Sequence, residues 1–125
     1  RVQQRRDYES MIELLFLLLF GHALADYPLQ GDFLARAKNH RAPLPGVPWW
    51  QALAAHATIH AGVVGVIVMF VTGVLWMAIM LALLELVLHA LIDYCKSDQL
   101  IDYNVDQLMH VLCKVLWWKI AVVLT

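Results

Sequence analysis

Four long apolar runs alternate with short polar segments along the chain. Runs of about 20 apolar residues are long enough to cross a bilayer as α-helices. Consecutive spans must run in opposite directions, so the pattern predicts an all-α integral membrane protein arranged as a four-helix bundle. Residues 1–125 are expected to form a single transmembrane domain, with helices over about residues 8–27, 49–71, 74–96 and 104–125.

The connections group these helices into two helical hairpins. In the one sizeable connection, Asp32 is expected to begin a short amphipathic turn that ends at Asn39, and the prolines after it exclude regular structure. Thr72 and Gly73 leave room only for an antiparallel turn. The basic segment 1–7 is predicted to be a polar leader. A signal peptide is the competing interpretation, but a cleavable segment would not be expected to share polar residues with a later helix.

A short motif occurs twice, as HALADY at residues 22–27 and as HALIDY at residues 89–94. Each copy places a histidine four residues before an aspartate, so the two side chains share one helical face. Because the first and third helices run the same way, the halves are expected to form a pseudo-twofold parallel repeat. The same spacing recurs in the pairs His56/His60 and Asp106/His110.

All four polar pairs fall toward the same side of the predicted membrane domain. Ionisable groups inside a bilayer cost on the order of 2.5–3.5 kcal/mol each, so they need one another or a cation. Histidine and carboxylate groups are ligands for zinc, iron and manganese. The pattern therefore favours a divalent metal site, with zinc first and iron or manganese as alternatives, over a metal-free polar network or proton path. The predicted ligands are His22, Asp26, His56, His60, His89, Asp93, Asp106 and His110.

Composition agrees with a membrane protein and excludes other classes. Hydrophobic residues make up 62% of the chain and charged residues 15%, with a mean hydropathy of +0.66. A formal net charge of -1 without a dense basic patch argues against nucleic acid as a partner. The two cysteines, Cys95 and Cys113, are too few for a disulfide framework and are interpreted as packing residues.

Further polar residues surround the pairs. Asp93, Glu85 and Lys96 are the candidate catalytic groups, with Glu85 able to ligate, to orient His89 or to act as a base. Gln30 and Gln107 are candidates for binding a carboxylate or an anion, and ordinary snorkelling is the alternative for Lys96. His40 is expected to be a solvated loop residue. Trp76, Trp117 and Trp118 are expected at the opposite interface.

The segments HALADYPLQGDFLARAK, HATIH, HALIDYCK and DQLMH together resemble a family of small polytopic membrane proteins of bacteria and phages, domain of unknown function 3307. The resemblance extends from His22 to Lys114. It implies a multi-pass protein whose signature positions are His22, Asp26, Pro28, Gln30, His60, His89, Asp93, Lys96, Asp106, Gln107 and His110. A looser similarity connects the arrangement to small membrane proteins described as metal-dependent hydrolases.

Three functions are consistent with these features. The first is a membrane-embedded, metal-dependent hydrolase of a lipid or phosphoester, in which Lys96 steadies an anionic head group. The second is a proton- or ion-translocating protein, which requires a polar path from Glu85 toward Glu13. The third is a structural or accessory subunit of a larger membrane complex. The expected partners are the lipid bilayer, a lipid substrate, and a second copy or other subunits, in the bacterial inner membrane.

Overall fold

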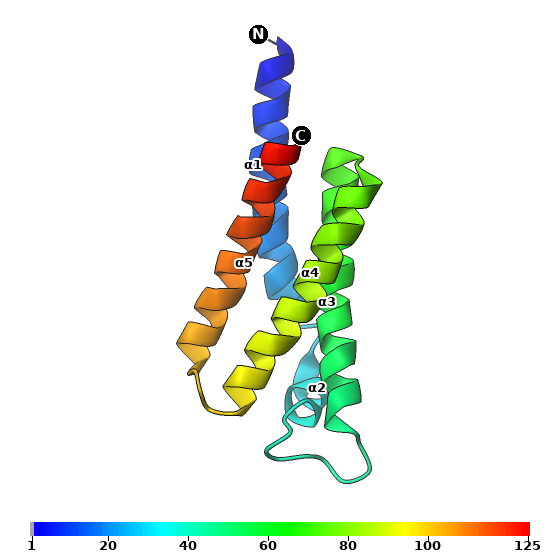
Figure 1. Ribbon diagram of the computed structural model, residues 1–125, viewed down its shortest axis with the longest axis vertical. Helices are drawn as coiled ribbons and strands as arrows, with labels where there is room; N and C mark the ends of the chain where they lie inside the picture. The colour runs from blue at the N-terminus through cyan, green and yellow to red at the C-terminus, as the bar shows by residue number, and fades with distance from the viewer. Residues whose placement is uncertain (1) are drawn as a thin grey trace.

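The computed structural model of the protein describes residues 2–125, and that part of the chain is helical without any strand. It contains four long helices and one short helix. Figure 1 shows that the long helices alternate in direction and that the short helix and a loop lie at one end. The all-α prediction is therefore confirmed. The helices are α1 (Val2–Asp26), α2 (Gly31–Ala37), α3 (Trp49–Thr72), α4 (Leu75–Ser97) and α5 (Tyr103–Leu124).

Local signals explain two of the helix ends. Gly73 ends α3 with a positive φ of 68°, a conformation that glycine adopts without steric cost, and its N–H donates to Met69 O. Asp102 begins α5 by accepting a hydrogen bond from the Val105 N–H. The predicted polar leader was wrong for residues 2–7, which continue α1. Glutamine and arginine are good helix formers, so polarity there carries no stop signal.

The long helices meet in pairs that close a ring. Helix α1 contacts α3 and α5, and α4 contacts the same two helices, while α2 packs against α3. Contact between α1 and α3 is close at Gly21, where a Cβ atom would lie 2.6 Å from Val63 Cγ1. The absence of a side chain at this position is what allows the two backbones to approach.

Three helices, α3, α4 and α5, are long and apolar enough to cross a membrane. The segments Glu9–Asp26 and Gly31–Ala37 pass the same test together, although an 80° bend separates them, and they would make a fourth span. Large apolar side chains also cover the outer surface, including Phe16, Phe70 and Leu83. An apolar exterior of this extent suits contact with hydrocarbon.

Each long helix presents one buried ridge whose residues are spaced three or four apart. Every ridge is apolar toward one end of the molecule and polar toward the other. The apolar halves form a continuous core centred on residues such as Leu18, Val68, Leu81 and Trp117. The ridges are Leu14, Leu18, His22 and Asp26 in α1; His56, His60, Val64 and Val68 in α3; Met77, Leu81, Glu85, His89 and Asp93 in α4; and Asp106, His110, Lys114, Trp117 and Ala121 in α5.

Candidate metal centre

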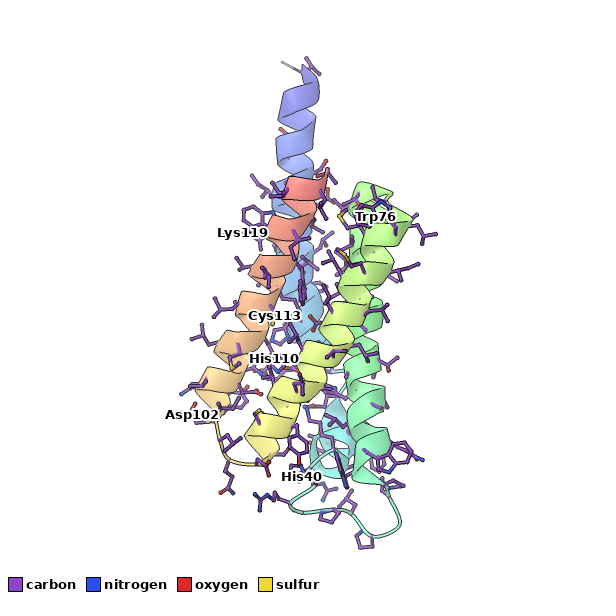
Figure 2. All side chains as sticks on the ribbon, in the orientation of Figure 1. His40, Trp76, Asp102, His110, Cys113 and Lys119 are labelled. Atoms are coloured by element: carbon purple, nitrogen blue, oxygen red, sulfur yellow. The ribbon has the colours of Figure 1, made fainter. Side chains whose placement is uncertain are left out.

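The polar halves of the four ridges meet in one layer. Each long helix contributes one of the pairs recognised in the sequence, and all eight predicted ligands are at most 9% exposed. The imidazole rings are close together: His89 stacks on His60 with 3.7 Å between ring centroids and on His110 with 4.1 Å. The i,i+4 spacing thus places donors from four separate helices in one buried cluster, within the half of the molecule where Figure 2 labels His110.

Two aspartates lie between these histidines. Asp26 Oδ1 is 3.0 Å from His60 Nε2 and 3.3 Å from His56 Nε2. Asp93 Oδ1 is 3.4 Å from His110 Nε2, and its Oδ2 is 3.6 Å from His89 Nε2. Zinc binds nitrogen and oxygen ligands at about 2.0–2.2 Å, so ligands of one ion lie roughly 3–3.6 Å apart. The observed separations match that requirement.

Three of the histidines have no hydrogen-bond partner on either ring nitrogen in the described part of the chain. These are His56, His89 and His110, and each is at most 1% exposed. A neutral imidazole carries one donor and one acceptor, and leaving such groups unsatisfied in an apolar interior costs about 1–3 kcal/mol each. Nitrogen lone pairs that face carboxylate oxygens without a hydrogen bond are what a bound cation would satisfy.

Among the described residues, two groups bring one ligand atom each to within 4.8 Å of the others. The first group comes from α1, α3 and α4, and the second from α4 and α5. His89 belongs to both, so two ions held here would be neighbours. The groups are Asp26, His56, His60 and His89, and His89, Asp93 and His110.

The other two predicted ligands lie beside these groups. His22 Nε2 is 3.2 Å from Gln107 Oε1 and 3.7 Å from Asp26 Oδ2. Asp106 Oδ1 is 3.4 Å from His110 Nε2 and makes no hydrogen bond. Gln107 Nε2 donates to Asp26 Oδ2 at 2.8 Å. Oδ2 is the carboxylate oxygen that does not face His56 and His60. Gln107 therefore hydrogen-bonds a buried carboxylate of the cluster.

Glu85 lies deeper than the ligand groups and is 1% exposed. Lys114 Nζ donates to its Oε1 and Trp117 Nε1 to its Oε2, both at 2.6 Å. The same Oε1 is 3.3 Å from His89 Nδ1, on the ring edge opposite Nε2. Both Glu85 oxygens already accept hydrogen bonds, and the carboxylate lies against the Nδ1 edge of His89 without hydrogen-bond geometry. Carboxylates beside ligating histidines orient their rings, so Glu85 is suited to positioning His89.

Sequence reasoning missed both partners of Glu85. Trp117 was expected at an interface, and that prediction was wrong: its side chain is 1% exposed and lies in the core. Burial is favourable for an indole whose N–H finds an acceptor. Trp76, in contrast, is exposed at the far end of the molecule, as Figure 2 shows. Lys114 could have been found, because it continues the spacing of four from His110.

A small polar cavity of about 90 Å³ lies over the carboxylates at the end of the molecule that carries α2. Lys38, which follows α2, donates from Nζ to Asp93 Oδ2 at 2.5 Å. Lys96 Nζ contacts Asp106 Oδ2 at 3.2 Å. Lys38 was not predicted, because spacing within helices does not reveal where a loop folds back. The lining residues are Asp26, Tyr27, Gln30, Lys38, Asp93, Lys96, Tyr103, Asp106 and Gln107.

His40 is not the solvated loop residue that was expected. Its ring stacks on Tyr94 with 4.3 Å between centroids, and Nε2 lies 2.8 Å from Asp98 Oδ1. Arg41 Nε donates to the same oxygen at 2.7 Å. The hydrogen bond from the Arg41 guanidinium holds the pKa of Asp98 below its usual value, and the hydrogen bond with His40 lowers it further. This ion-pair cluster ties the connection after α2 to the end of α4.

Comparison with known proteins identifies one family. Residues 14–125 match the sequence profile of the family described as "Protein of unknown function (DUF3307)", which covers all four long helices in whole or in part. No curated protein and no solved structure matches the chain.

Proposed function

The chain belongs to the DUF3307 family of proteins of unknown function, and we propose that it is a membrane-embedded, metal-dependent hydrolase of ester or phosphoester bonds in amphiphilic substrates. The observation that carries the proposal is the set of buried imidazoles without hydrogen-bond partners, facing carboxylate oxygens at ligand-like separations. The resemblance of the chain to small polytopic membrane proteins of bacteria and phages supports the proposal that it spans the bacterial inner membrane several times.

In this proposal the chain is one transmembrane domain and a four-helix bundle with a pseudo-twofold parallel repeat. The ring of helix contacts is what such a repeat requires, because α1 and α4 each lie between α3 and α5. Asp26 and Asp93, from the two copies of the motif, then hold equivalent positions on opposite sides of the site. The bent α1–α2 segment would make the fourth span, with α2 delivering Lys38 to the mouth of the site.

The two groups divide the ligands between one or two divalent ions, with His89 able to serve either. A donor set of imidazoles and carboxylates suits zinc first, and iron or manganese as alternatives. A bound cation of this kind lowers the pKa of its water to about 7 and polarises the group under attack. Asp106 Oδ1, buried and without a hydrogen bond, is placed to accept a proton beside His110.

We assign Glu85 to positioning and keep Asp93 and Lys96 at the reacting centre. Asp93 lines the cavity and faces histidines with both oxygens, so it joins the ligand groups to the space a substrate would enter. Lys96 is 35% exposed and also lines the cavity, where its ammonium can meet an anionic group. Gln30 lines the same cavity through a carboxamide whose Oε1 has no partner.

Transport is disfavoured by what fills the rest of the bundle. Leu14, Leu18, Val64, Val68 and Leu81 close the space beyond Glu85. Glu13, the next acid toward the far end, is exposed on the outer side of α1. A proton or ion path would have to cross this packed apolar core.

A structural or accessory role is the second candidate, and a specific observation favours it. Three ion pairs, Lys38 with Asp93, Lys96 with Asp106 and Lys114 with Glu85, compensate carboxylates without a metal. Such a network could hold four helices together, alone or within a homodimer or a larger membrane complex. In the described part of the chain it leaves the imidazoles of His56, His89 and His110 without hydrogen bonds, however.

Elemental analysis of the detergent-purified protein separates these functions. We expect one or two equivalents of zinc, iron or manganese in the wild type, and loss of metal with retained helicity in His89→Ala. His40→Ala is the matched control, because it removes a histidine outside the ligand groups and should keep the metal. A folded wild type that takes up no metal, even after metal addition, would refute the hydrolase and leave the structural role. If the wild type contains metal, the metal-loaded protein is screened for hydrolysis of ester and phosphoester amphiphiles.

A further inference from the structure

The polar cavity over the metal-ligand groups has the form of an anion site. Its walls come from the ends of α1, α4 and α5 and from the residue after α2, so four segments distant in sequence close around it. Two ammonium groups, Lys38 and Lys96, line it together with the paired hydroxyls of Tyr27 and Tyr103. Asp26, Asp93 and Asp106 form the side nearest the histidines.

Lys38 and Lys96 each have N–H donors that make no hydrogen bond to the described residues. An ammonium group carries three N–H donors, and the structure gives each lysine one hydrogen bond, from Lys38 to Asp93 and from Lys96 to Asp106. Two donors on each are therefore left for a ligand or water. Gln30 Oε1 is buried and has no partner, so it can accept a hydrogen bond from a protonated oxygen of the ligand.

The charge of the layer depends on the metal. Four carboxylates, Glu85 and three aspartates, face three lysines. With the carboxylates ionised and the imidazoles neutral, as metal ligands must be, the layer carries one net negative charge. One divalent ion changes that to one positive charge, and two ions change it to three. Excess charge in a membrane interior is costly, so the metal-loaded layer should recruit an anion.

The size and donors of the cavity specify which anion. The cavity, with a volume of about 90 Å³, has room for a small oxyanion beside its two lysines. A phosphate group carries a charge of about −1.5 to −2 and three strong acceptor oxygens, enough to contact two lysines and a cation at once. A carboxylate carries only one charge and two acceptor oxygens, so it would match two lysines and a cation less well than a phosphate group does.

We propose that the metal-loaded protein binds one phosphate group between Lys38 and Lys96, and that its substrates are therefore phosphate monoesters. This inference rests on the proposed metal centre and deepens it by naming the substrate class. The apolar exterior places the cavity beside lipid, but a soluble phosphate ester shares the same head-group chemistry.

Equilibrium dialysis with radiolabelled inorganic phosphate tests the proposal on detergent-purified protein whose metal content is measured in the same sample. We expect about one equivalent of phosphate on the metal-loaded wild type and at least tenfold weaker binding after the metal is removed by chelation. Lys38→Gln and Lys96→Gln should each weaken binding tenfold or more, since a charged hydrogen bond is lost. Lys119→Gln, at the far end of the molecule in Figure 2, is the matched control and should bind as the wild type does.

The outcomes are distinguishable. A metal-loaded wild type that binds no phosphate, or lysine variants that keep both metal and phosphate, overturns this inference and leaves the metal centre intact. Equal binding with and without metal also overturns it. If Lys38→Gln loses its metal, the more exposed Lys96 provides the deciding variant. Displacement by dioctanoyl phosphatidate at lower concentration than by glycerol 3-phosphate supports a lipid substrate, and equal potency supports a soluble one.

Discussion

Replacing Lys114 by methionine probes the buried positioning network most directly. Its ammonium is 1% exposed and donates to Glu85 Oε1 at 2.6 Å. Methionine keeps much of the volume but leaves the Glu85 carboxylate with the Trp117 indole as its remaining hydrogen-bond donor in the structure. Removing one partner of a buried ion pair costs about 3–5 kcal/mol, because the other charge stays uncompensated. We expect Lys114→Met to lower the free energy of unfolding by that amount.

The assay is reversible unfolding in mixed micelles with increasing dodecyl sulfate, followed by far-ultraviolet circular dichroism. The double variant Lys114→Met/Glu85→Gln removes both charges and should recover most of the loss, since a buried pair replaced as a whole is often neutral. Lys119→Met changes an exposed lysine on the same helix and should stay within about 0.5 kcal/mol of the wild type. The reasoning is refuted if Lys114→Met is as stable as that control, or if the double variant is no more stable than the single one.

The geometry also predicts the effects of three substitutions and of one change in pH. Glu85→Gln should weaken metal binding about 10–100-fold in a chelator competition assay, because it loosens the orientation of a ligating histidine. Gly21→Ala should lower unfolding free energy by about 1–3 kcal/mol, because its Cβ would lie 2.6 Å from an α3 side chain. A Cβ at Gly62, inside α3, meets nothing within 4 Å, so Gly62→Ala should be stabilising, by at most about 1 kcal/mol. Asp98→Asn should speed tryptic cleavage after Arg41, which it anchors. Because pairing lowers the pKa of Asp98, protection of the same segment against hydrogen exchange, measured relative to the intrinsic exchange rate at each pH, should fall only below about pH 4.

The helices and the polar pairs could be predicted from the sequence because both depend on local periodicity. A run of apolar residues predicts a helix whatever its neighbours are, and a spacing of four places two side chains on one face. His22 with Asp26 and His89 with Asp93 follow from that rule alone. Their meeting in one layer followed from the alternating direction of the spans.

What the sequence did not reveal depends on contacts between distant segments. Lys38 reaches Asp93 only because the chain turns back after α2, and no local pattern encodes that turn. Trp117 has an indole N–H that suits an interface or a buried acceptor equally, and Glu85 on another helix decides between them. His40 was misjudged for the same reason, since its partners Tyr94 and Asp98 belong to the end of α4.

The contrast between the two halves of the bundle bears on whether the polar layer is merely structural. In one half the four long helices pack through Leu14, Val68, Leu81, Trp117 and their neighbours, so an apolar core is sufficient to hold these helices together. Continuing the same ridges with histidine and carboxylate adds desolvation costs that packing does not require. The polar half also lies at the end where Lys38 and a small polar cavity meet it. A layer that is costly to bury and reachable from one end is more readily explained by a bound cation and its ligand than by helix association.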